Sequence, residues 1–496
     1  MALFTEIVTP AVTYKQPLGL FINNEFHSGI EGRVFEVLNP HDASVITSVC
    51  EATAKDVDIA VAAARAAFKG AWKTTTPAER GKMLIRLANL IDEHVDILTA
   101  IESLDNGKSL TAARADIEDS AGCIRYYGGW ADKVVGQTID TDPANFNYTR
   151  HEAIGVCGQI IPWNFPLLMW AWKIGPALAT GNTVVMKVAE NTPLSALYTA
   201  QLVTQAGFPP GVLNIIAGFG RTAGAAMASH MDIDRIAFTG SSLVGRQILK
   251  AAADSNLKKV TLELGGKSPN IVFPCADLDK AVKWVNFGAY NAHGQSCDAG
   301  SRVLVHKDIY GKFVEKLKEQ ALANNVGNPF SPDTFQGPVV SQIQFDRIMG
   351  YIEKGKGEGA KVEIGGERRG SKGYYIEPTI FSNVTPDMTI VKEEIFGPVC
   401  TVQKFDDEDD AIEIANSTVY GLAAGIHATN VNTILRVSRE IKAGTIWVNN
   451  YGYLSHQAPF GGYKLSGIGR ELGSYALETY TEIKTVRIYN GPAVSV

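Results

Sequence analysis

Between residues 180 and 255 the chain alternates short β-branched stretches with stretches of helical character. Apolar runs at 182–187, 212–217 and 235–239 are each followed by a segment that carries helix start and stop signals. Strands that alternate with helices of about ten to fifteen residues form parallel sheets that are covered on both faces. The alternation therefore predicts an α/β protein. Dinucleotide sites are common in such sheets.

A second α/β unit is predicted from about residue 258. Strands are expected at 258–264, 270–273 and 302–306, with a helix at 277–291. We expect the two units to pack against each other, and a cleft between domains is a favoured ligand site. A capping box at 76–79 predicts an earlier helix, followed by an apolar stripe of expected core residues: Leu84, Leu87, Ile91, Val95 and Leu98.

Composition and charge exclude several classes of protein. The chain has 496 residues, 45% hydrophobic and 20% charged, which fits a globular protein and not a disordered one. Its net charge of −6 is too small and too evenly spread to indicate nucleic acid or a membrane surface as partner. The cysteines lack the close spacing of metal sites and disulfide scaffolds, and the N-terminus lacks a signal-peptide pattern. We expect reduced thiols, no metal and a cytoplasmic location.

A glycine-containing turn at 238–245 is the first candidate contact for a cofactor. It follows a predicted strand and opens a predicted helix, where the backbone can approach a ligand and the helix N-terminus favours a phosphate. An ordinary strand-to-helix connection explains the turn alone at least as well. Lys187, at the end of its strand, and Glu190 are placed to reach a ribose, and an exposed, solvated loop is the alternative.

Cys297 and Glu263 are the candidate reactive groups. Cys297 lies in a glycine-flanked turn at 294–301, which favours a reactive thiol, although lone cysteines in turns are usually inert. The neighbouring Asp298 opposes ionisation of that thiol. Glu263 lies between two leucines of a predicted strand, where a charged carboxylate is costly unless paired or protonated. It is either a general base with a raised pKa or half of a structural ion pair.

Six motifs occur along the chain: PWNFP at 162–166, FTGSSLVG at 238–245, LELGGK at 262–267, GQSC at 294–297, EEIFGP at 393–398 and PFGGYK at 459–464. Together and in this order they resemble the NAD(P)-dependent aldehyde dehydrogenase superfamily. The likeness runs from about Leu20 to about Tyr480 and is strongest to non-acylating cytosolic and mitochondrial enzymes, including fungal members.

The resemblance implies oxidation of an aldehyde to a carboxylic acid with reduction of NAD. Cys297 would attack the carbonyl as a thiolate, and the Asn164 amide with the Cys297 backbone N–H would hold the oxyanion of the hemithioacetal. After hydride transfer to the nicotinamide, Glu263 would activate the water that hydrolyses the thioester. Cys297, Glu263 and Asn164 are therefore the expected catalytic residues.

The resemblance also implies contacts for the cofactor and the substrate. Cofactor contacts are expected from Ile161, Trp163, Lys187, Glu190, Gly220, Phe238, Thr239, Gly240, Ser241, Val244, Gly245, Gln344, Glu394 and Phe396. The aldehyde pocket is expected to comprise Phe165, Met169, Trp172, Ser296, Asp298, Leu454 and Phe460. Because the Glu190 carboxylate would repel a 2′-phosphate, NAD is predicted over NADP, with Lys187 leaving NADP possible.

Asp298 and the loop at 449–456 depart from the pattern of this superfamily. Close relatives often carry small or sulfur-containing residues beside the nucleophile, so Asp298 suggests a cationic or polyhydroxylated aldehyde. A solvated or backbone-capping carboxylate is the alternative for Asp298, and core packing is the alternative for each pocket aromatic.

Three parts and a homo-oligomer are also implied. An NAD-binding domain with a Rossmann-like sheet is expected at 1–129 and 151–263, an α/β catalytic domain at 264–477, and a small β arm at 130–150 and 478–496. The arm's tail can pair with a neighbour's sheet, so we expect a dimer or tetramer that acts on a small-molecule aldehyde. Two rivals stay open: a cofactor-independent thiol esterase, and a catalytically retired binding or structural homologue.

Overall fold

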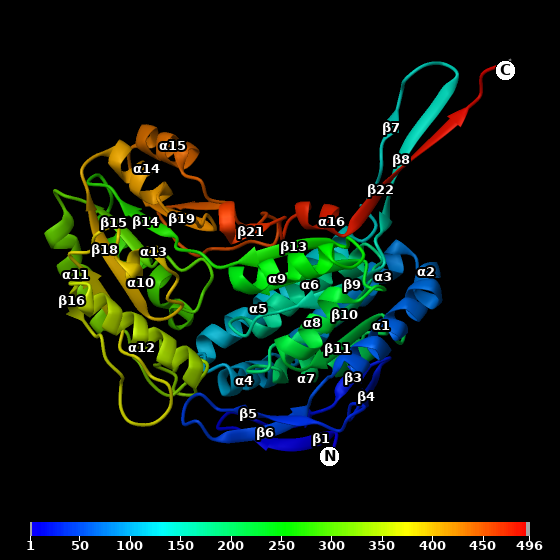
Figure 1. Cartoon of the computed structure of the whole chain (residues 1–496), viewed down its shortest axis with the longest axis horizontal. Coiled ribbons are helices and arrows are strands. Elements are labelled where there is room, and N and C mark those ends of the chain that lie inside the picture. The colour runs from blue at the N-terminus through cyan, green and yellow to red at the C-terminus, as the bar shows by residue number, and fades with distance from the viewer. Residues whose placement is uncertain (1, 493–496) are drawn as a thin grey trace.

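Two large β-sheets form the centres of two lobes, and a narrow β arm projects from one lobe (Figure 1). The structure is a computed structural model that describes residues 2–492. No helix in those residues is both long and apolar enough to cross a membrane.

The first sheet has eight strands and a parallel centre. In spatial order they are β21 (Gly467–Ile468), β13 (Lys259–Leu264), β12 (Arg235–Gly240), β9 (Val156–Ile160), β10 (Thr183–Val188), β11 (Leu213–Ala217), β3 (Leu20–Ile22) and β4 (Glu25–His27). Strands β13 to β11 run parallel, whereas β21, β3 and β4 join antiparallel at the edges. The strands predicted between 180 and 264 are confirmed.

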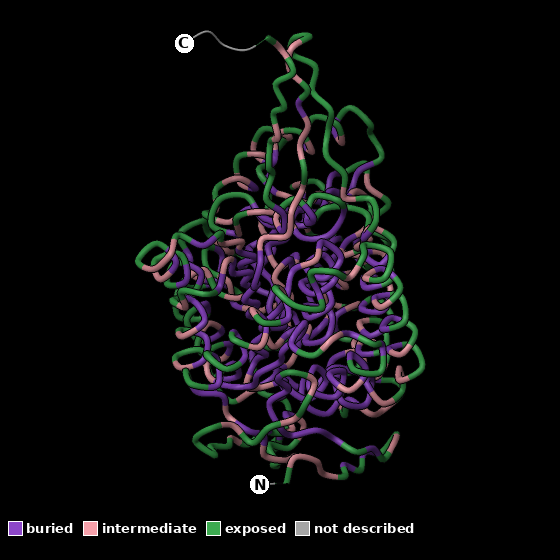
Figure 2. Tube along the Cα trace, turned by 90° about the vertical axis from the view of Figure 1, so that its right-hand side faces the viewer, coloured by how far each residue is buried: buried purple, intermediate pink, exposed green. Residues whose placement is uncertain are grey.

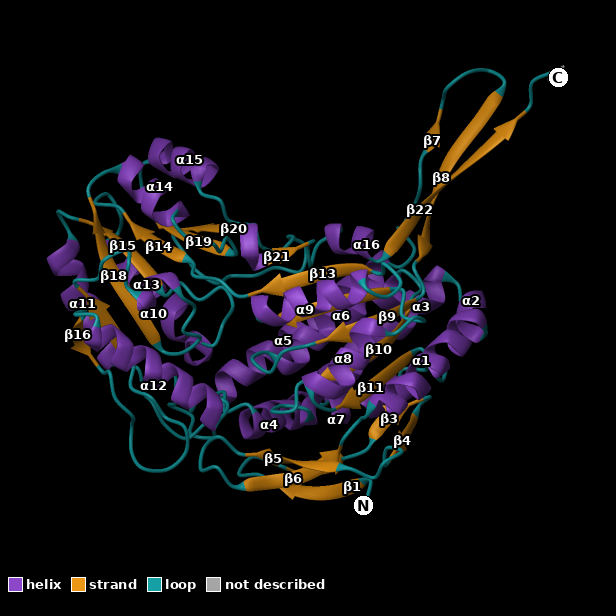
Figure 3. Ribbon diagram, viewed as in Figure 1, coloured by secondary structure: helices purple, strands orange, loops and turns teal. Residues whose placement is uncertain are grey.

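Helices cover both faces of this sheet (Figure 3). Along β10, Val184 and Met186 belong to one hydrophobic cluster and Val185 to another, and all three are fully buried. The first cluster includes α2 (Ala71–Thr74), α3 (Pro77–Glu93), α4 (Val95–Asp105), α5 (Leu110–Trp130), α6 (Pro166–Ala179) and α7 (Leu194–Gln205). The second includes α1 (Ala54–Lys69), η1 (Gly220–Gly224), α8 (Ala225–Ser229) and α9 (Ser242–Ala253). Continuous apolar strands are what a doubly covered parallel sheet requires.

The second sheet repeats this construction with seven strands. Their spatial order is β16 (Lys361–Ile364), β17 (Thr379–Ser382), β18 (Val399–Phe405), β15 (Arg302–His306), β14 (Pro269–Val272), β19 (Ala423–His427) and β20 (Thr445–Val448). Only β16 is antiparallel to its neighbour among these described strands. The helices of this lobe are α10 (Leu278–Tyr290), η2 (Asn291–Gly294), α11 (Tyr310–Leu322), α12 (Gln342–Gly357), α13 (Thr389–Lys392), α14 (Glu408–Asn416) and α15 (Val431–Glu440).

The helix predicted from the apolar stripe is two helices in the structure. Its start is confirmed, since Thr76 and Glu79 form the capping box. The helix breaks at His94, whose ring nitrogen lies 2.8 Å from the Tyr198 hydroxyl of α7. The prediction of one continuous helix was wrong there, whereas the predicted core stripe is confirmed, because all five of its residues pack in or against the first hydrophobic cluster. The predicted helix near 221–230 likewise begins with the π-helical turn η1.

The arm is a three-stranded antiparallel sheet in the order β22 (Thr481–Tyr489), β8 (Asn145–Ala153) and β7 (Thr138–Ile139). The C-terminal strand pairs with β8 of its own chain along its whole length, from Thr481 opposite Ala153 to Tyr489 opposite Asn145. The edge of β22 that faces away from β8 pairs with no strand within residues 2–492. Most of the arm is exposed (Figure 2).

Short elements complete the structure. They are the hairpins β1 (Phe4–Val8) with β2 (Thr13–Pro17) and β5 (Val34–Leu38) with β6 (Val45–Cys50), together with η3 (Lys464–Ser466) and α16 (Tyr475–Thr479). The segment 467–468, which was expected in the catalytic domain, supplies the edge strand β21 of the first sheet. The division of the chain into three functional units stays a prediction.

Candidate active site

Two adjoining hollows between the lobes share four residues: Asn164, Thr239, Glu263 and Cys297. The first, here called the apolar chamber, is also lined by Phe165, Leu168, Met169, Trp172, Ser296, Asp298, Leu454, Phe460 and Glu471. The second, the sheet-edge chamber, is also lined by Pro162, Trp163, Gly240, Ser241, Leu264, Gly265, Gln344, Arg347, Glu394 and Phe396. The three predicted catalytic residues therefore lie where the two chambers meet.

Parallel strand order explains this convergence. The carboxyl ends of β9, β12 and β13 meet at one edge of the first sheet, which places Asn164, Thr239 and Glu263 together. Cys297 comes from the other lobe, in the turn after η2. The Asn164 side-chain amide donates a hydrogen bond of 2.9 Å to the Gln295 carbonyl and so ties the two lobes together at the thiol.

Asn164 keeps a free donor for a ligand. A side-chain amide has two N–H groups, and the bond to the Gln295 carbonyl uses one of them. Because Asn164 lines both chambers beside Cys297, its second N–H is available to an oxygen bound at the thiol. This is the arrangement that an oxyanion hole requires.

Acidic groups surround the Cys297 thiol. Burial raises its pKa well above that of an ordinary thiol, and the carboxylates of Asp298, Glu263 and Glu394 raise the pKa further. The predicted opposition of Asp298 to ionisation is confirmed. In the resting structure the thiol is therefore protonated near neutral pH.

Glu263 is a buried carboxyl without an ion-pair partner in the described residues. It is 5% exposed, and its Oε2 atom has no hydrogen-bond partner there. Burial raises its pKa well above the usual value, Glu471 raises it further, and Lys173 and Arg470 oppose the shift. The ion-pair alternative is not what the structure shows. A carboxyl whose pKa is raised by burial is suited to general acid–base work.

Lys173 and Glu471 belong to the site and were missed from the sequence. The fully buried Lys173 amine contacts the Glu471 carboxylate and donates a hydrogen bond of 2.6 Å to the Thr239 hydroxyl. The sequence does contain a sign of Lys173's role, because it is a charged residue in the otherwise largely apolar helix α6, all of whose 14 residues are buried. Glu471 lies 298 residues away in the chain and has no comparable signal.

The sheet-edge chamber combines two aromatic rings with polar groups. The Trp163 and Phe396 rings meet edge to face with centroids 5.3 Å apart. Gln344 donates a hydrogen bond of 2.7 Å to the Phe396 carbonyl, and Glu394 accepts one of 3.0 Å from the Gly266 N–H. Burial raises the pKa of Glu394 to about 7. Gly265 leaves room for this carboxylate, because an added Cβ would lie 2.1 Å from Glu394 Oε2 and would displace the end of that side chain.

Several predicted cofactor residues lie outside the lining of the two chambers: Ile161, Lys187, Glu190, Gly220, Phe238, Val244 and Gly245. Lys187 is 3% exposed and its amine lies 3.5 Å from Glu190 Oε2, so the solvated-loop alternative was wrong for Lys187. Gly245 lets α9 pack close to β13, since an added Cβ would lie 3.0 Å from a Leu264 methyl group. Whether these residues contact a cofactor stays a prediction.

A third hollow, the outer channel, shares Phe165, Leu168, Ser296, Asp298 and Leu454 with the apolar chamber. Tyr451, Gly452 and Leu454 of the loop 449–456 line it. The solvated alternative for Asp298 was wrong, because its side chain is buried and accepts a hydrogen bond from the Ser296 hydroxyl. Burial raises the pKa of Asp298, and this hydrogen bond opposes the shift.

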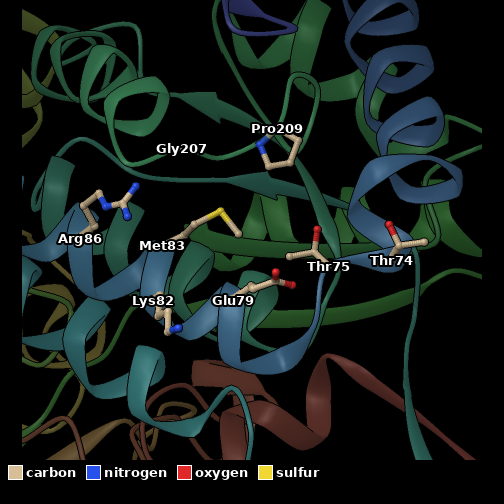
Figure 4. Close-up of a pocket in the computed structure, with 8 residues that line it drawn as sticks. All are labelled: Thr74, Thr75, Glu79, Lys82, Met83, Arg86, Gly207 and Pro209. Atoms are coloured by element: carbon tan, nitrogen blue, oxygen red, sulfur yellow. The ribbon is translucent and has the colours of Figure 1, made fainter.

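A separate surface hollow contains none of the predicted site residues (Figure 4). It lies beside α3 and the turn after α7 and is lined by Thr74, Thr75, Glu79, Lys82, Met83, Arg86, Gly207 and Pro209. Its lining holds no cysteine and no buried carboxyl, in contrast to the two chambers.

Comparison with known proteins gives a consistent result. The profile of the aldehyde dehydrogenase family matches residues 26–486. An aldehyde dehydrogenase of Emericella nidulans is 66% identical over 492 residues, which are 99% of this chain and 99% of that protein. The mitochondrial aldehyde dehydrogenase of Homo sapiens is 53% identical over 95% of this chain and 91% of its own. The NAD+ complex of an aldehyde dehydrogenase from Bacillus cereus superposes with a TM-score of 0.94 at 52% identity, covering 95% of this chain and 96% of that one.

The charge around Cys297 predicts the pH at which it is alkylated. Although partial burial opposes it, backbone hydrogen bonds from Asn430 and Thr429 lower the pKa of the exposed Cys275. In the absence of cofactor, the rate of alkylation by iodoacetamide should rise with pH for both thiols. The midpoint of that rise should lie below pH 9 for Cys275 and above pH 9 for Cys297. Peptide mass spectrometry across a pH series measures both in one sample. Equal midpoints, or an earlier one for Cys297, would show that the carboxylates do not control the thiol.

Proposed function

The chain belongs to the aldehyde dehydrogenase family, and on that premise we propose that it oxidises an aldehyde to a carboxylic acid while reducing NAD. One observation supports this above all: Cys297, Glu263 and Asn164 line both chambers at their junction. A thiol nucleophile, a carboxyl that exchanges protons and a free amide donor are the groups that acyl chemistry at an aldehyde carbon needs.

The sheet-edge chamber fits NAD. Gly240 and Ser241 line it just before α9, a 12-residue helix whose N-terminal N–H groups suit a pyrophosphate. Trp163, Phe396, Gln344 and Glu394 would hold the nicotinamide half, and Lys187 with Glu190 the adenosine ribose. When bound, NAD supplies the acceptor for the hydride that the aldehyde carbon loses. The Bacillus cereus relative binds NAD+ on a backbone that this chain closely matches.

The chain's own groups divide the remaining work. Cys297 Sγ bonds to the carbonyl carbon once its proton has passed to solvent water, and the second Asn164 N–H with the Cys297 backbone N–H stabilises the oxyanion. Loss of hydride leaves a thioester on Cys297. Glu263 then takes a proton from the water that attacks this thioester, which releases the carboxylic acid and restores the thiol. The buried Lys173 amine favours the ionised form of Glu263 that this step needs.

The family assignment does not favour the two rival functions. A cofactor-independent esterase would leave the sheet-edge chamber without a purpose, and a retired homologue would have no reason to retain the thiol, the carboxyl and the amide at one junction. Cytoplasmic location stays a prediction, since a relative named as mitochondrial is 53% identical to this chain.

We also propose that the arm assembles a homodimer or homotetramer. The nine-residue strand β22 forms an open edge of the arm and exposes Ile483, Ile488 and Tyr489. A long open edge with apolar side chains is a template for pairing with another chain. The other two parts of the chain would then have separate roles: the first sheet would hold the cofactor, and the second lobe would supply the nucleophile.

Replacing Glu263 should separate the two halves of the reaction. In Glu263→Gln, we expect a first burst of NADH close to one per active site, followed by turnover slowed by about 10²- to 10⁴-fold, because only hydrolysis needs the base. Cys297→Ala should give neither phase. Stopped-flow absorbance of NADH measures both. Glu413→Gln, at an exposed position of α14, is the matched control and should behave as the wild type. A Glu263→Gln enzyme with wild-type turnover would remove the assigned role.

Glu190 should set the preference for NAD. The wild type should use NAD more efficiently than NADP, and Glu190→Gln should lower the ratio of kcat/KM values by roughly tenfold, because a carboxylate no longer repels the 2′-phosphate. Steady-state kinetics with both cofactors measure the ratio, with the exposed Glu93→Gln as control. Equal efficiency of the wild type with the two cofactors would contradict this assignment.

Removing β22 should dissociate the assembly. A chain that ends before Thr481 loses the strand that pairs with β8, and light scattering should then report a smaller particle than the full chain. A chain that ends after Tyr489 keeps the strand and should keep the assembly. If the shorter truncation left the particle mass unaltered, the arm would not be the assembly element.

A further inference from the structure

The outer channel is lined by carboxylates in excess of cations. Four aspartates line it, Asp116, Asp119, Asp298 and Asp333, against the single amine of Lys108. Lys108 is 1% exposed and forms an ion pair with Asp116, so these two charges offset each other. Within residues 2–492 the other three carboxylates have no ion-pair partner. A ligand that travels along this channel meets a negative wall.

Asp298 lies where this wall reaches the reaction centre. It follows Cys297 in sequence, is 8% exposed, and lines both the outer channel and the apolar chamber. The Ser296 hydroxyl donates to its Oδ1 atom, and the Tyr451 hydroxyl donates a hydrogen bond of 2.6 Å to its backbone carbonyl. The first bond orients the side chain and the second holds the Asp298 backbone, and no donor of the described chain bonds to the Oδ2 atom.

The apolar chamber carries two further buried carboxyl oxygens without partners. Glu263 and Glu471 both line it, and in the described structure the Oε2 atom of each lacks a hydrogen-bond partner. No lysine or arginine is among the residues that line this chamber. Its walls include the rings of Trp172 and Phe460, and that of Phe165, over which the Lys108 amine already lies 3.7 Å from the ring centroid. Aromatic faces attract cations, and buried carboxylates gain most from a charged partner.

We propose that the site selects aldehydes that carry an ammonium group, and that Asp298 is the residue that sets this preference. The proposal rests on the function proposed above and names its substrate class. An anionic aldehyde would be repelled by the channel. A polyhydroxylated aldehyde could bond to Asn164, Thr239 and Ser296 in the apolar chamber, but its neutral hydroxyl groups would offset none of the carboxylate charge. An ammonium group would pair with the Asp298 carboxylate, whose Oδ2 atom accepts no hydrogen bond from the described chain.

Two aldehydes of the same shape isolate the charge. In 3-aminopropanal an ammonium group occupies the place of the terminal methyl group of butanal, and near pH 7.5 the amine is protonated because alkylamines of the lysine type titrate near 10.4. The measured quantity is the ratio of kcat/KM values, 3-aminopropanal over butanal, with NAD. Comparing variants with the same two aldehydes cancels their different degrees of hydration.

Asp298→Asn keeps the shape of the side chain and removes its charge. We expect this variant to lower the ratio by roughly tenfold, whereas Asp254→Asn, which removes an exposed charge at the end of α9, should leave it unaltered. In the wild type the ratio should fall as salt is added, because salt screens the channel. The salt dependence of the wild-type ratio tests the proposal even if Asp298→Asn fails to fold.

The outcomes separate the two proposals. A wild type that oxidises neither aldehyde would overturn the proposed function. A wild type that oxidises butanal, but whose ratio responds neither to Asp298→Asn nor to salt, would overturn the ammonium preference alone. If the variant is inactive with both aldehydes, a ratio that falls with salt supports the preference and a ratio independent of salt overturns it.

Discussion

Burial of several carboxyl groups around one thiol is the interaction on which the site depends. Charged carboxylates are costly to remove from water, and three of them face Cys297. The Lys173 amine contacts Glu471 and opposes the rise in the pKa of Glu263, so one buried cation balances part of this charge. The consequence is that the pKa values of the Cys297 thiol and of the Glu263 carboxyl both lie well above their ordinary values. Both properties follow from the same desolvation.

The packing of the two lobes brings the thiol, the carboxyl and the amide together. Strand ends of the first sheet supply Asn164 and Glu263, and the turn after η2 supplies Cys297 from the other lobe. The contact is tight, since a Cβ on Gly266 would lie 2.7 Å from the Cys297 carbonyl. A small shift between the lobes would therefore separate the thiol from the amide. The hydrogen bond from the Asn164 amide to the Gln295 carbonyl joins the two lobes at this point.

Local patterns were enough to predict the strands and to single out the reactive groups. β-branched runs identified β10, β11 and β12, and the glycines around Cys297 and the leucines beside Glu263 identified two unusual environments. No local signal predicted the break at His94, where the ring contacts Tyr198 of another helix. The pairing of β22 with β8 joins segments more than 300 residues apart, and the family resemblance, not a local pattern, placed both in one arm. The burial of Asp298 depends in the same way on the distant Tyr451. Contacts of this kind are set by the assembled fold, which local sequence does not encode.

The convergence of thiol, carboxyl and amide is tested most directly by identifying the atom that carries the acyl group. The wild-type enzyme would be mixed with NAD and a radiolabelled aldehyde, quenched in acid within milliseconds, and digested for peptide mass spectrometry. The account predicts an acyl group on the peptide that contains Cys297, present only when NAD is included. Label on another residue, or turnover with no acylated peptide, would contradict it.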